Sequence, residues 1–240
     1  MIGSKIHHYK EIVSTNDIAF GLAKNGAAHG EVVVAETQTK GRGRMGRLWE
    51  SPAGRSICMS VILRPDSSVE TSPLTLVVGI AVADALKNFT KGELKVKWPN
   101  DIWLNGKKLC GILAEKGDGA IVVGIGVNVN SEKSDLSPEV SGIATSLKEE
   151  EGKAFDPEAV LKNICEELDN YYNVFVADGF DPFVALYNSW SLINDKEVSV
   201  TFNNEVTKGV AIGIDTDGAL LLRKEGAVKK IIAGDVSLCF

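Results

Sequence analysis

The chain has 240 residues, 44% of them hydrophobic and 24% charged, and a formal net charge of −6. This acidic balance argues against broad, non-specific binding to nucleic acid, which requires a basic face. No stretch approaches the ~18 consecutive apolar residues of a membrane span, and residues 1–10 lack the apolar core of a signal peptide. The four cysteines have no paired spacing, which indicates a reduced, cytoplasmic protein.

The first 190 residues predict a main domain of strands and helices. Ser14 stands where a helix N-cap belongs, with Asp17 three residues later as a weak capping box, and that helix ends at Asn25-Gly26. Ser72-Pro73 begins a second, largely apolar helix, and Asp156-Pro157 begins a long one. Strands are expected within 1–10 and at 31–36, 57–63, 95–104, 107–114 and 121–127, with a hairpin at Asn105-Gly106.

Residues 191–240 have a different texture. Short strands are expected at 198–202, 206–214, 219–222 and 228–232, with tight turns at Asp217-Gly218 and Glu225-Gly226. This pattern predicts a small β-barrel of about 50 residues that packs on the main domain.

A basic segment, Lys40-Gly41-Arg42-Gly43-Arg44-Met45-Gly46-Arg47, stands out in this acidic chain. Glycines let backbone amides approach a ligand closely, and guanidinium groups bind phosphate or carboxylate oxygens in pairs. The segment therefore predicts an anion-binding loop. By itself it leaves two alternatives open, a solvated surface loop and an RNA-binding glycine-arginine tract.

A second motif, Lys97-Trp98-Pro99-Asn100-Asp101, leads into the hairpin that carries Lys107 and Lys108. Asp101 could hold Mg²⁺, which prefers carboxylate oxygen, and a lysine on a strand offers a compact charge for carboxylate or phosphate. A turn followed by a solvated lysine pair is the alternative. Strict alternation groups Lys108 with Cys110 and Ile112, and it does not decide which lysine faces a site.

Two weaker motifs are Ser14-Thr15-Asn16 before the first helix and Gly124-Ile125-Gly126-Val127-Asn128-Val129-Asn130 in a strand. Three neighbouring polar side chains could line a polar pocket, although a helix cap alone would account for them. Glycines leave space on the surface of a strand, although a twisted strand ending in an Asn turn has the same pattern.

The order of these motifs is more specific than any one of them. Together with Glu36-Thr37-Gln38-Thr39, Trp49, Lys108-Leu109-Cys110-Gly111 and Gly234-Asp235-Val236-Ser237-Leu238, the succession closely resembles the biotin–protein ligase family over about residues 7–239. The resemblance implies an α+β fold. A mixed β-sheet flanked by helices, as in class II synthetases, would form a catalytic domain (1–190), and a small SH3-like β-barrel would follow (191–240).

The resemblance also implies a two-step reaction. The carboxylate of biotin attacks the α-phosphorus of ATP to give biotinyl-adenylate and pyrophosphate, and a carrier lysine then attacks the adenylate and releases AMP. Because a carboxylate and a triphosphate repel each other, the site needs fixed cations. The resemblance implies three catalytic residues. Arg42 would contact the biotin carboxylate and the phosphate of ATP, and Lys108 rather than Lys107 would contact the carboxylate and the adenylate phosphate. Asp101 would be linked to Mg²⁺.

The binding residues are carried over by the same resemblance. Biotin is expected to contact Ser14, Thr15, Asn16, Gln38, Gly41, Arg42, Gly43, Arg44, Lys108, Gly111 and Gly126, the first four at its ureido ring and the last two beside its apolar body. ATP is expected to contact Arg42, Arg44, Arg47, Trp49, Lys97, Asn100, Lys108 and Asn128, with Trp49 and Asn128 at the adenine. Gly41 to Arg47 is expected to be a mobile lid that keeps water from the adenylate.

The partner implied by the resemblance is the biotin carrier domain of a carboxylase or decarboxylase, and the expected assembly is a homodimer. Some relatives begin with a DNA-binding domain and act as repressors; here the catalytic pattern starts within the first fifteen residues. We therefore expect an enzyme that binds neither DNA nor membranes. Met45 stands where many relatives have another arginine. The nearest alternative is a lipoate–protein ligase or octanoyltransferase, and the Gly-Arg-Gly-Arg loop followed by Lys-Trp-Pro-Asn-Asp favours biotin.

Overall fold

A computed structural model describes residues 1–117 and 119–239; residue 240, the last of the expected C-terminal domain, lies outside these ranges. The first seven strands are β1 (Ile6–Ile12), β2 (Val32–Gln38), β3 (Ser56–Leu63), β4 (Leu94–Lys97), β5 (Asp101–Leu104), β6 (Lys107–Gly117) and β7 (Ala120–Asn128). The helices are α1 (Thr15–Lys24), α2 (Leu74–Leu86), α3 (Pro138–Ser141), α4 (Leu147–Glu151), α5 (Pro157–Asp178) and α6 (Asp181–Trp190), with short 3-10 turns η1 (Arg44–Gly46) and η2 (Lys133–Asp135).

These seven strands form one mixed sheet in the order β1-β2-β3-β7-β6-β5-β4. β1 and β2 are parallel, and the other neighbouring pairs are antiparallel. A parallel pair needs a crossover connection, which α1 supplies. The predicted mixed sheet flanked by helices is confirmed.

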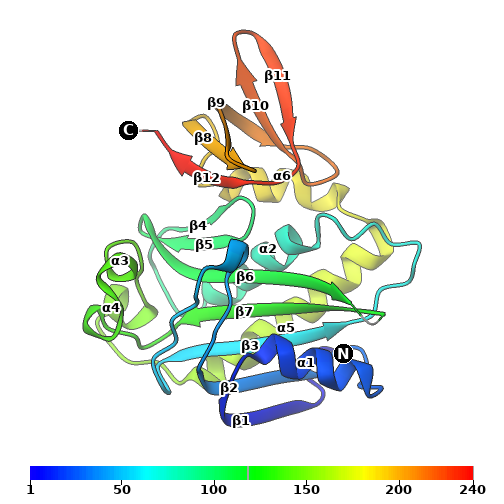
Figure 1. Cartoon of the computed structure of the whole chain (residues 1–240), viewed down its shortest axis with the longest axis vertical. Helices are drawn as coiled ribbons and strands as arrows, with labels where there is room; N and C mark the ends of the chain where they lie inside the picture. The colour runs from blue at the N-terminus through cyan, green and yellow to red at the C-terminus, as the bar shows by residue number, and fades with distance from the viewer. Residues whose placement is uncertain (118, 240) are drawn as a thin grey trace.

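Helices cover both faces of this sheet (Figure 1). α2 and α5 pack on each other and on one face, and α1 packs on the other face over β2, β3 and β7. Because α2 contacts β4, β5 and β6 as well as α5 and α6, almost every residue in it is buried, which accounts for its apolar sequence. β3 is buried along its whole length for the same reason, since α1 and α5 contact it from opposite faces.

The remaining strands are β8 (Glu197–Phe202), β9 (Glu205–Ile214), β10 (Leu220–Lys224), β11 (Ala227–Ile231) and β12 (Asp235–Leu238). They form a separate antiparallel sheet in the order β11-β10-β9-β8-β12 at one end of the molecule (Figure 1), consistent with the expected SH3-like domain. The buried indole of Trp98 donates a hydrogen bond to the carbonyl of Gly218 at 3.0 Å and so links the two sheets. We propose the domain boundary near residue 190, after α6.

Several local expectations are confirmed. Asn105 (φ 50°) and Gly106 (φ 79°) have the left-handed backbone that the tight β5–β6 hairpin requires. The side chain of Asp156 accepts a hydrogen bond from the Glu158 amide at 3.0 Å and caps α5. No helix in the described ranges combines the length and hydropathy needed to cross a membrane.

Other local expectations are wrong. Ser14 occupies the N-cap position of α1 as expected, but its side chain makes no capping hydrogen bond, and Asp17 pairs with Arg42 instead of completing a capping box. Pro73, not Ser72, occupies the cap position of α2. Residues 95–104 are two antiparallel strands rather than one, because Pro99 has no N–H to donate to a ladder and the chain turns there.

Candidate active site

A cavity of about 510 Å³ lies on the face of the main sheet that carries α1. β6 and β7 contribute its floor, the loop after β2 one wall, and residues 136–144 another. Thr201 and residues 235–237 of the C-terminal sheet complete the rim. Every predicted site residue lines this cavity except Gly41, which lies behind Trp49 and accepts its amide hydrogen bond at 2.9 Å.

Two arginines of the glycine-arginine loop meet the C-terminal sheet. Arg44 lies 3.5 Å from the Asp235 carboxylate and donates to the Gly234 carbonyl at 3.2 Å, and Arg47 pairs with the same carboxylate. Arg44 also lies 3.3 Å from Oδ1 of Asn100. Burial lowers the pKa of Arg44, but a guanidinium stays charged at neutral pH. One carboxylate therefore faces two cations, which leaves an excess of positive charge at this end of the cavity.

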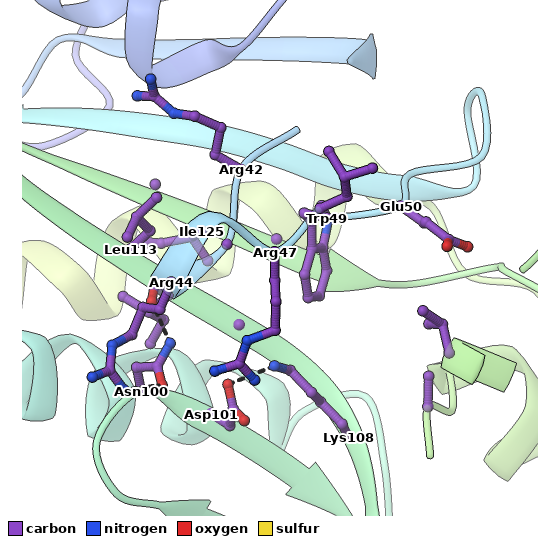
Figure 2. Close-up of a pocket in the computed structure, with 18 of the residues that line it drawn as sticks. Arg42, Arg44, Arg47, Trp49, Glu50, Asn100, Asp101, Lys108, Leu113 and Ile125 are labelled. Carbon is purple, nitrogen blue, oxygen red and sulfur yellow. Dashed lines mark hydrogen bonds and ion pairs between the residues drawn. The ribbon is translucent and has the colours of Figure 1, made fainter. Parts of the chain in front are cut away.

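Lys108 points into the cavity from β6, and its Nζ lies 2.7 Å from Oδ1 of Asp101 on β5 (Figure 2). The contact is an ion pair rather than a well-directed hydrogen bond, since Oδ1 has no hydrogen-bond partner of good geometry. Lys107 lies outside the cavity, 3.9 Å from Glu150. The structure therefore distinguishes the two lysines, which the sequence pattern alone did not.

A β-bulge decides the direction of Lys108. Ile102 pairs with Cys110 but Trp103 pairs with Lys108, so Leu109 is the extra residue in β6. The grouping of Lys108 with Cys110 and Ile112 by strict alternation is wrong. Lys108 instead shares a face with Gly111, whose added Cβ would lie 3.5 Å from Lys108 Cε, while Cys110 and Ile112 are buried in the core.

Arg42 is directed to the other side of the cavity. Its guanidinium lies 3.0 Å from Asp17 and 2.8 Å from Glu115, and Figure 2 shows the side chain pointing away from Asp101 and Lys108. The three expected catalytic residues are thus not gathered at one point: Lys108 and Asp101 are paired, and Arg42 is held apart by carboxylates of α1 and β6.

A buried polar network lies at the start of α1. The amide and hydroxyl of Thr15 donate to Oε1 of Gln38 at 2.8 and 3.0 Å. Ser60 lies 2.7 Å from the Thr15 hydroxyl and donates to Oδ1 of Asn16 at 2.6 Å, while Nδ2 of Asn16 donates to Glu115 at 2.6 Å. This end of the cavity can both donate to and accept from a compact polar ligand.

Trp49 covers the two glycines that were expected beside the apolar body of biotin. A Cβ on Gly111 would lie 2.9 Å from the indole, and one on Gly126 would overlap it. These glycines therefore accommodate a flat aromatic ring on the sheet surface, which differs from the expected direct contact with biotin.

Three buried polar atoms of cavity-lining residues have no hydrogen-bond partner: Oδ1 of Asp101, which is ion-paired with Lys108, Nε1 of Trp49 and Oδ1 of Asn128. The amide nitrogen of Asn128 donates to the Thr145 carbonyl at 3.1 Å, which fixes the orientation of the side chain. Buried polar groups are normally paired, so an unpaired donor and an unpaired acceptor beside a cavity indicate a place where a ligand can bond.

The charged groups limit which metal the site can hold. Within the described ranges no group of three or more His, Cys, Asp or Glu side chains is placed to bind an ion. Asp101 is a nearly buried carboxylate, 17% exposed, that faces the cavity. One carboxylate suits Mg²⁺, which keeps several waters and takes its remaining oxygens from substrate phosphates.

Beside this carboxylate, burial lowers the pKa of Lys97, whose ammonium lies 5.0 Å over the ring of Trp103.

Sequence reasoning missed several residues that contact the cavity lining. Ser60 and Glu115 do not line the cavity themselves but hold Asn16, which does. They lie within strands and carry no local signal of a site, and only the folding of the chain brings them to Asn16. Asp235 belongs to a motif that the sequence analysis noted, but its contact with the arginine loop depends on how the two sheets pack.

Comparisons with known proteins show which family this chain belongs to. A family model described as the biotin/lipoate A/B protein ligase family matches residues 9–131, and one described as the biotin protein ligase C terminal domain matches residues 195–239. A bifunctional ligase/repressor BirA of Bacillus spizizenii is 37% identical over 99% of this chain and 75% of its own length. A biotin–[acetyl-CoA-carboxylase] ligase of Paracoccus denitrificans is 34% identical over 93% of this chain and 96% of its own. The solved biotin protein ligase of Aquifex aeolicus in complex with biotin and ATP superposes with a TM-score of 0.89 at 31% identity, covering 98% of this chain and 99% of that one.

Proposed function

The chain belongs to the biotin/lipoate A/B protein ligase family, and we infer from its relatives that it is a biotin–protein ligase. It uses ATP to convert biotin to biotinyl-adenylate and transfers the biotinyl group to a lysine of a biotin-carrying protein. The residue roles given below are our proposals.

One observation carries the assignment: three cations, Arg44, Arg47 and Lys108, face a single cavity in an acidic chain, and each is paired with a carboxylate. A carboxylate substrate and a triphosphate approach each other only if fixed cations offset their repulsion. We propose that phosphate oxygens compete with Asp235 for the two arginines. Lys108 then stabilises the charge that develops on the α-phosphate while biotin attacks.

The two ends of the cavity suit the two substrates. The network of Thr15, Asn16 and Gln38 offers donors and acceptors to the ureido ring of biotin. At the other end, the unpaired Oδ1 of Asn128 can accept a hydrogen bond from the amino group of adenine, and the indole of Trp49 offers a flat face for stacking. Arg42 is held at the biotin end by Asp17 and Glu115, and we propose that it leaves them for the biotin carboxylate.

Asp101 is the residue that we propose would hold Mg²⁺. When bound there, the ion would neutralise part of the triphosphate charge. Asp101 also orients Lys108, and both tasks need the buried carboxylate that β5 supplies.

The carrier is a biotin-accepting protein, and we propose a carboxylase or decarboxylase carrier domain. Dependence on ATP and four unpaired cysteines, Cys58, Cys110, Cys165 and Cys239, support a cytoplasmic location. We also propose a homodimer that does not bind DNA, which sedimentation with and without duplex DNA would test.

The function is tested by incubating the chain with Mg²⁺, ATP and a biotin-acceptor domain, and offering biotin, lipoate or octanoate in separate reactions. The intact mass of the acceptor is the readout. We expect a mass increase with biotin alone. An increase with lipoate or octanoate instead would overturn the substrate assignment, and no increase with any acid would overturn the ligase assignment.

A further inference from the structure

The outer wall of the cavity, residues 132–144, has almost no hydrophobic anchoring. None of residues 132–143 is buried, and neither η2 nor α3 contains a buried residue, although Ser131 and Ala144 on either side are buried. Segments with few buried apolar contacts open easily. The position of this wall must therefore depend on polar contacts.

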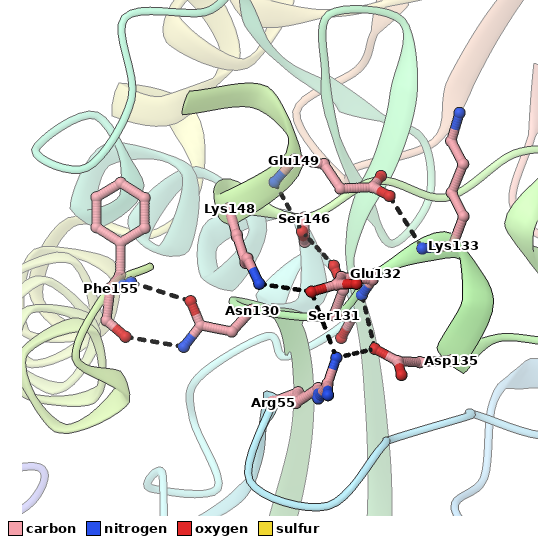
Figure 3. Close-up of polar contacts among 10 residues, drawn as sticks. All are labelled: Arg55, Asn130, Ser131, Glu132, Lys133, Asp135, Ser146, Lys148, Glu149 and Phe155. Atoms are coloured by element: carbon pink, nitrogen blue, oxygen red, sulfur yellow. Dashed lines mark hydrogen bonds and ion pairs between the residues drawn. The ribbon is translucent and has the colours of Figure 1, made fainter. Parts of the chain in front are cut away.

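Those contacts converge on Arg55, which follows the arginine loop just before β3 (Figure 3). Its Nη1 lies 2.7 Å from Oδ2 of Asp135 and 3.7 Å from Oε1 of Glu132. The same oxygen of Asp135 accepts the amide of Glu132 at 2.8 Å, and Nζ of Lys148 lies 2.5 Å from Glu132. We call these four residues, Arg55, Glu132, Asp135 and Lys148, the Arg55 clasp.

The wall is also tied to residues that touch the cavity. The amide of Ser137 donates to Oε2 of Glu50, the residue after Trp49, at 2.8 Å. At the far end, the Lys108 amide donates to the Ile143 carbonyl at 2.8 Å, and the Thr145 amide donates to the Lys108 carbonyl at 2.9 Å. The wall thus connects the segment of Trp49 with the backbone of Lys108, and a displacement of the wall would change the nucleotide end of the cavity.

We propose that Arg55 is a positioning residue for ATP, which holds the wall closed without contacting the substrate. The proposal rests on the proposed function, because it takes ATP as the ligand at this end. Arg55 does not line the cavity, and Leu136 and Val140 of the wall do. An isolated exposed ion pair stabilises a protein little, but here one arginine contacts two carboxylates. Asp135 also accepts a backbone amide, and Glu132 is also paired with Lys148. Loss of the clasp lowers the fraction of molecules with the wall in place, and apparent affinity falls by that fraction.

The test compares Arg55→Ala with Arg64→Ala. Arg64 is a matched control because it also binds across segments, donating to the carbonyls of Ala23 at 2.7 Å and Ala27 at 3.1 Å, but it lies outside the cavity lining. We expect Arg55→Ala to raise the KM for ATP by about tenfold and to change kcat and the KM for biotin by less than about twofold. Arg64→Ala should leave both KM values unchanged, and Arg55→Lys should recover part of the ATP affinity.

A second readout does not depend on activity. Amide hydrogen exchange of residues 132–144 should be faster in Arg55→Ala than in the wild type, and unchanged there in Arg64→Ala. If Arg55→Ala does not fold, Asp135→Ala removes the same contact and should give the same change in the KM for ATP. The role of Arg55 is overturned if the wild type transfers biotin and the folded variant has an unchanged KM for ATP. It is also overturned if the variant raises the KM for ATP and the KM for biotin by the same factor. A wild type that transfers no biotin overturns the proposed function instead.

Discussion

The Nζ of Lys108 lies 2.7 Å from Oδ1 of Asp101, across two strands whose register is shifted by one bulged residue. This pairing fixes a cation at the cavity before any substrate arrives, so it need not reorganise as charge develops. Lys107, its neighbour in sequence, points outward to Glu150. Lys107 and Lys108 are therefore two neighbouring lysines whose side chains point to different sides of β6, and one serves as the control for the other.

We predict that Lys108→Ala lowers kcat/KM for biotin transfer by about 10²- to 10³-fold, the usual effect of removing one group that stabilises the transition state. Lys107→Ala should change it by less than about twofold. Initial rates from the intact mass of the acceptor measure both. Equal losses of kcat/KM in Lys108→Ala and Lys107→Ala would contradict the prediction, because only Lys108 points into the cavity.

The glycines of β7 should separate the two substrates. In Gly126→Ala the new Cβ overlaps Trp49, so we expect the indole to be displaced and the KM for ATP to rise by about tenfold. In Gly124→Ala the new Cβ overlaps the Asn16 carboxamide, so the KM for biotin should rise instead. Measuring both constants for each variant checks this; a rise for the same substrate in both would contradict it.

Asp235 should oppose phosphate binding. In Asp235→Asn the carboxylate no longer neutralises Arg44 and Arg47, while Arg44 keeps its contacts with Asn100 and the Gly234 carbonyl. We expect the KM for ATP to fall by roughly two- to fivefold, with a steeper dependence on salt. Steady-state kinetics at two ionic strengths test this. A higher KM would show that Asp235 positions the arginines more than it competes with phosphate.

The segment from Gly41 to Arg47 should close over ligand. No residue of η1 is buried, and Met45 and Leu48 are 64% and 74% exposed. We expect amide exchange in this segment to slow when biotin and ATP are added together. Exchange in the buried strand β3 should not change and serves as the internal control. Unchanged exchange in the segment would exclude a lid.

Glu31 should make stability depend on pH. The hydrogen bond to His7, and then the Ala28 amide, hold the pKa of Glu31 at about 2 instead of 4.5. Because the folded-state pKa is the lower one, the stabilisation is present above about pH 4.5 and is lost as pH falls toward 2. We expect Glu31→Gln to lower the free energy of unfolding by roughly 1–2 kcal/mol at pH 7.

Urea unfolding at pH 7 and at pH 3 measures the effect of Glu31, and the difference from the wild type should shrink at the lower pH. Glu93→Gln controls for loss of a charge, since that carboxylate is 72% exposed. A difference between Glu31→Gln and the wild type that is the same at both pH values would contradict the prediction.

The sequence by itself predicted the features that depend on neighbouring residues. Asn105-Gly106 specified a hairpin and Asp156 a helix start, because the signals lie within a few residues of the structure that they determine. The order of the motifs identified the family and many of the residues that line the cavity. Local signals were less exact at two other helix starts: Ser14 is the N-cap residue of α1 but makes no side-chain capping bond, and Pro73 rather than Ser72 is the cap residue of α2.

Only the tertiary structure decided how those residues face one another. The bulge at Leu109 depends on the register of β5 against β6, and it turns Lys108 into the cavity. Trp49 lies on Gly126, and Asp235 meets Arg44, because the loop, the sheet and the C-terminal domain pack together from positions far apart in the chain. Periodicity along one strand carries no information about such contacts, since they are set by the free energy of packing several segments at once.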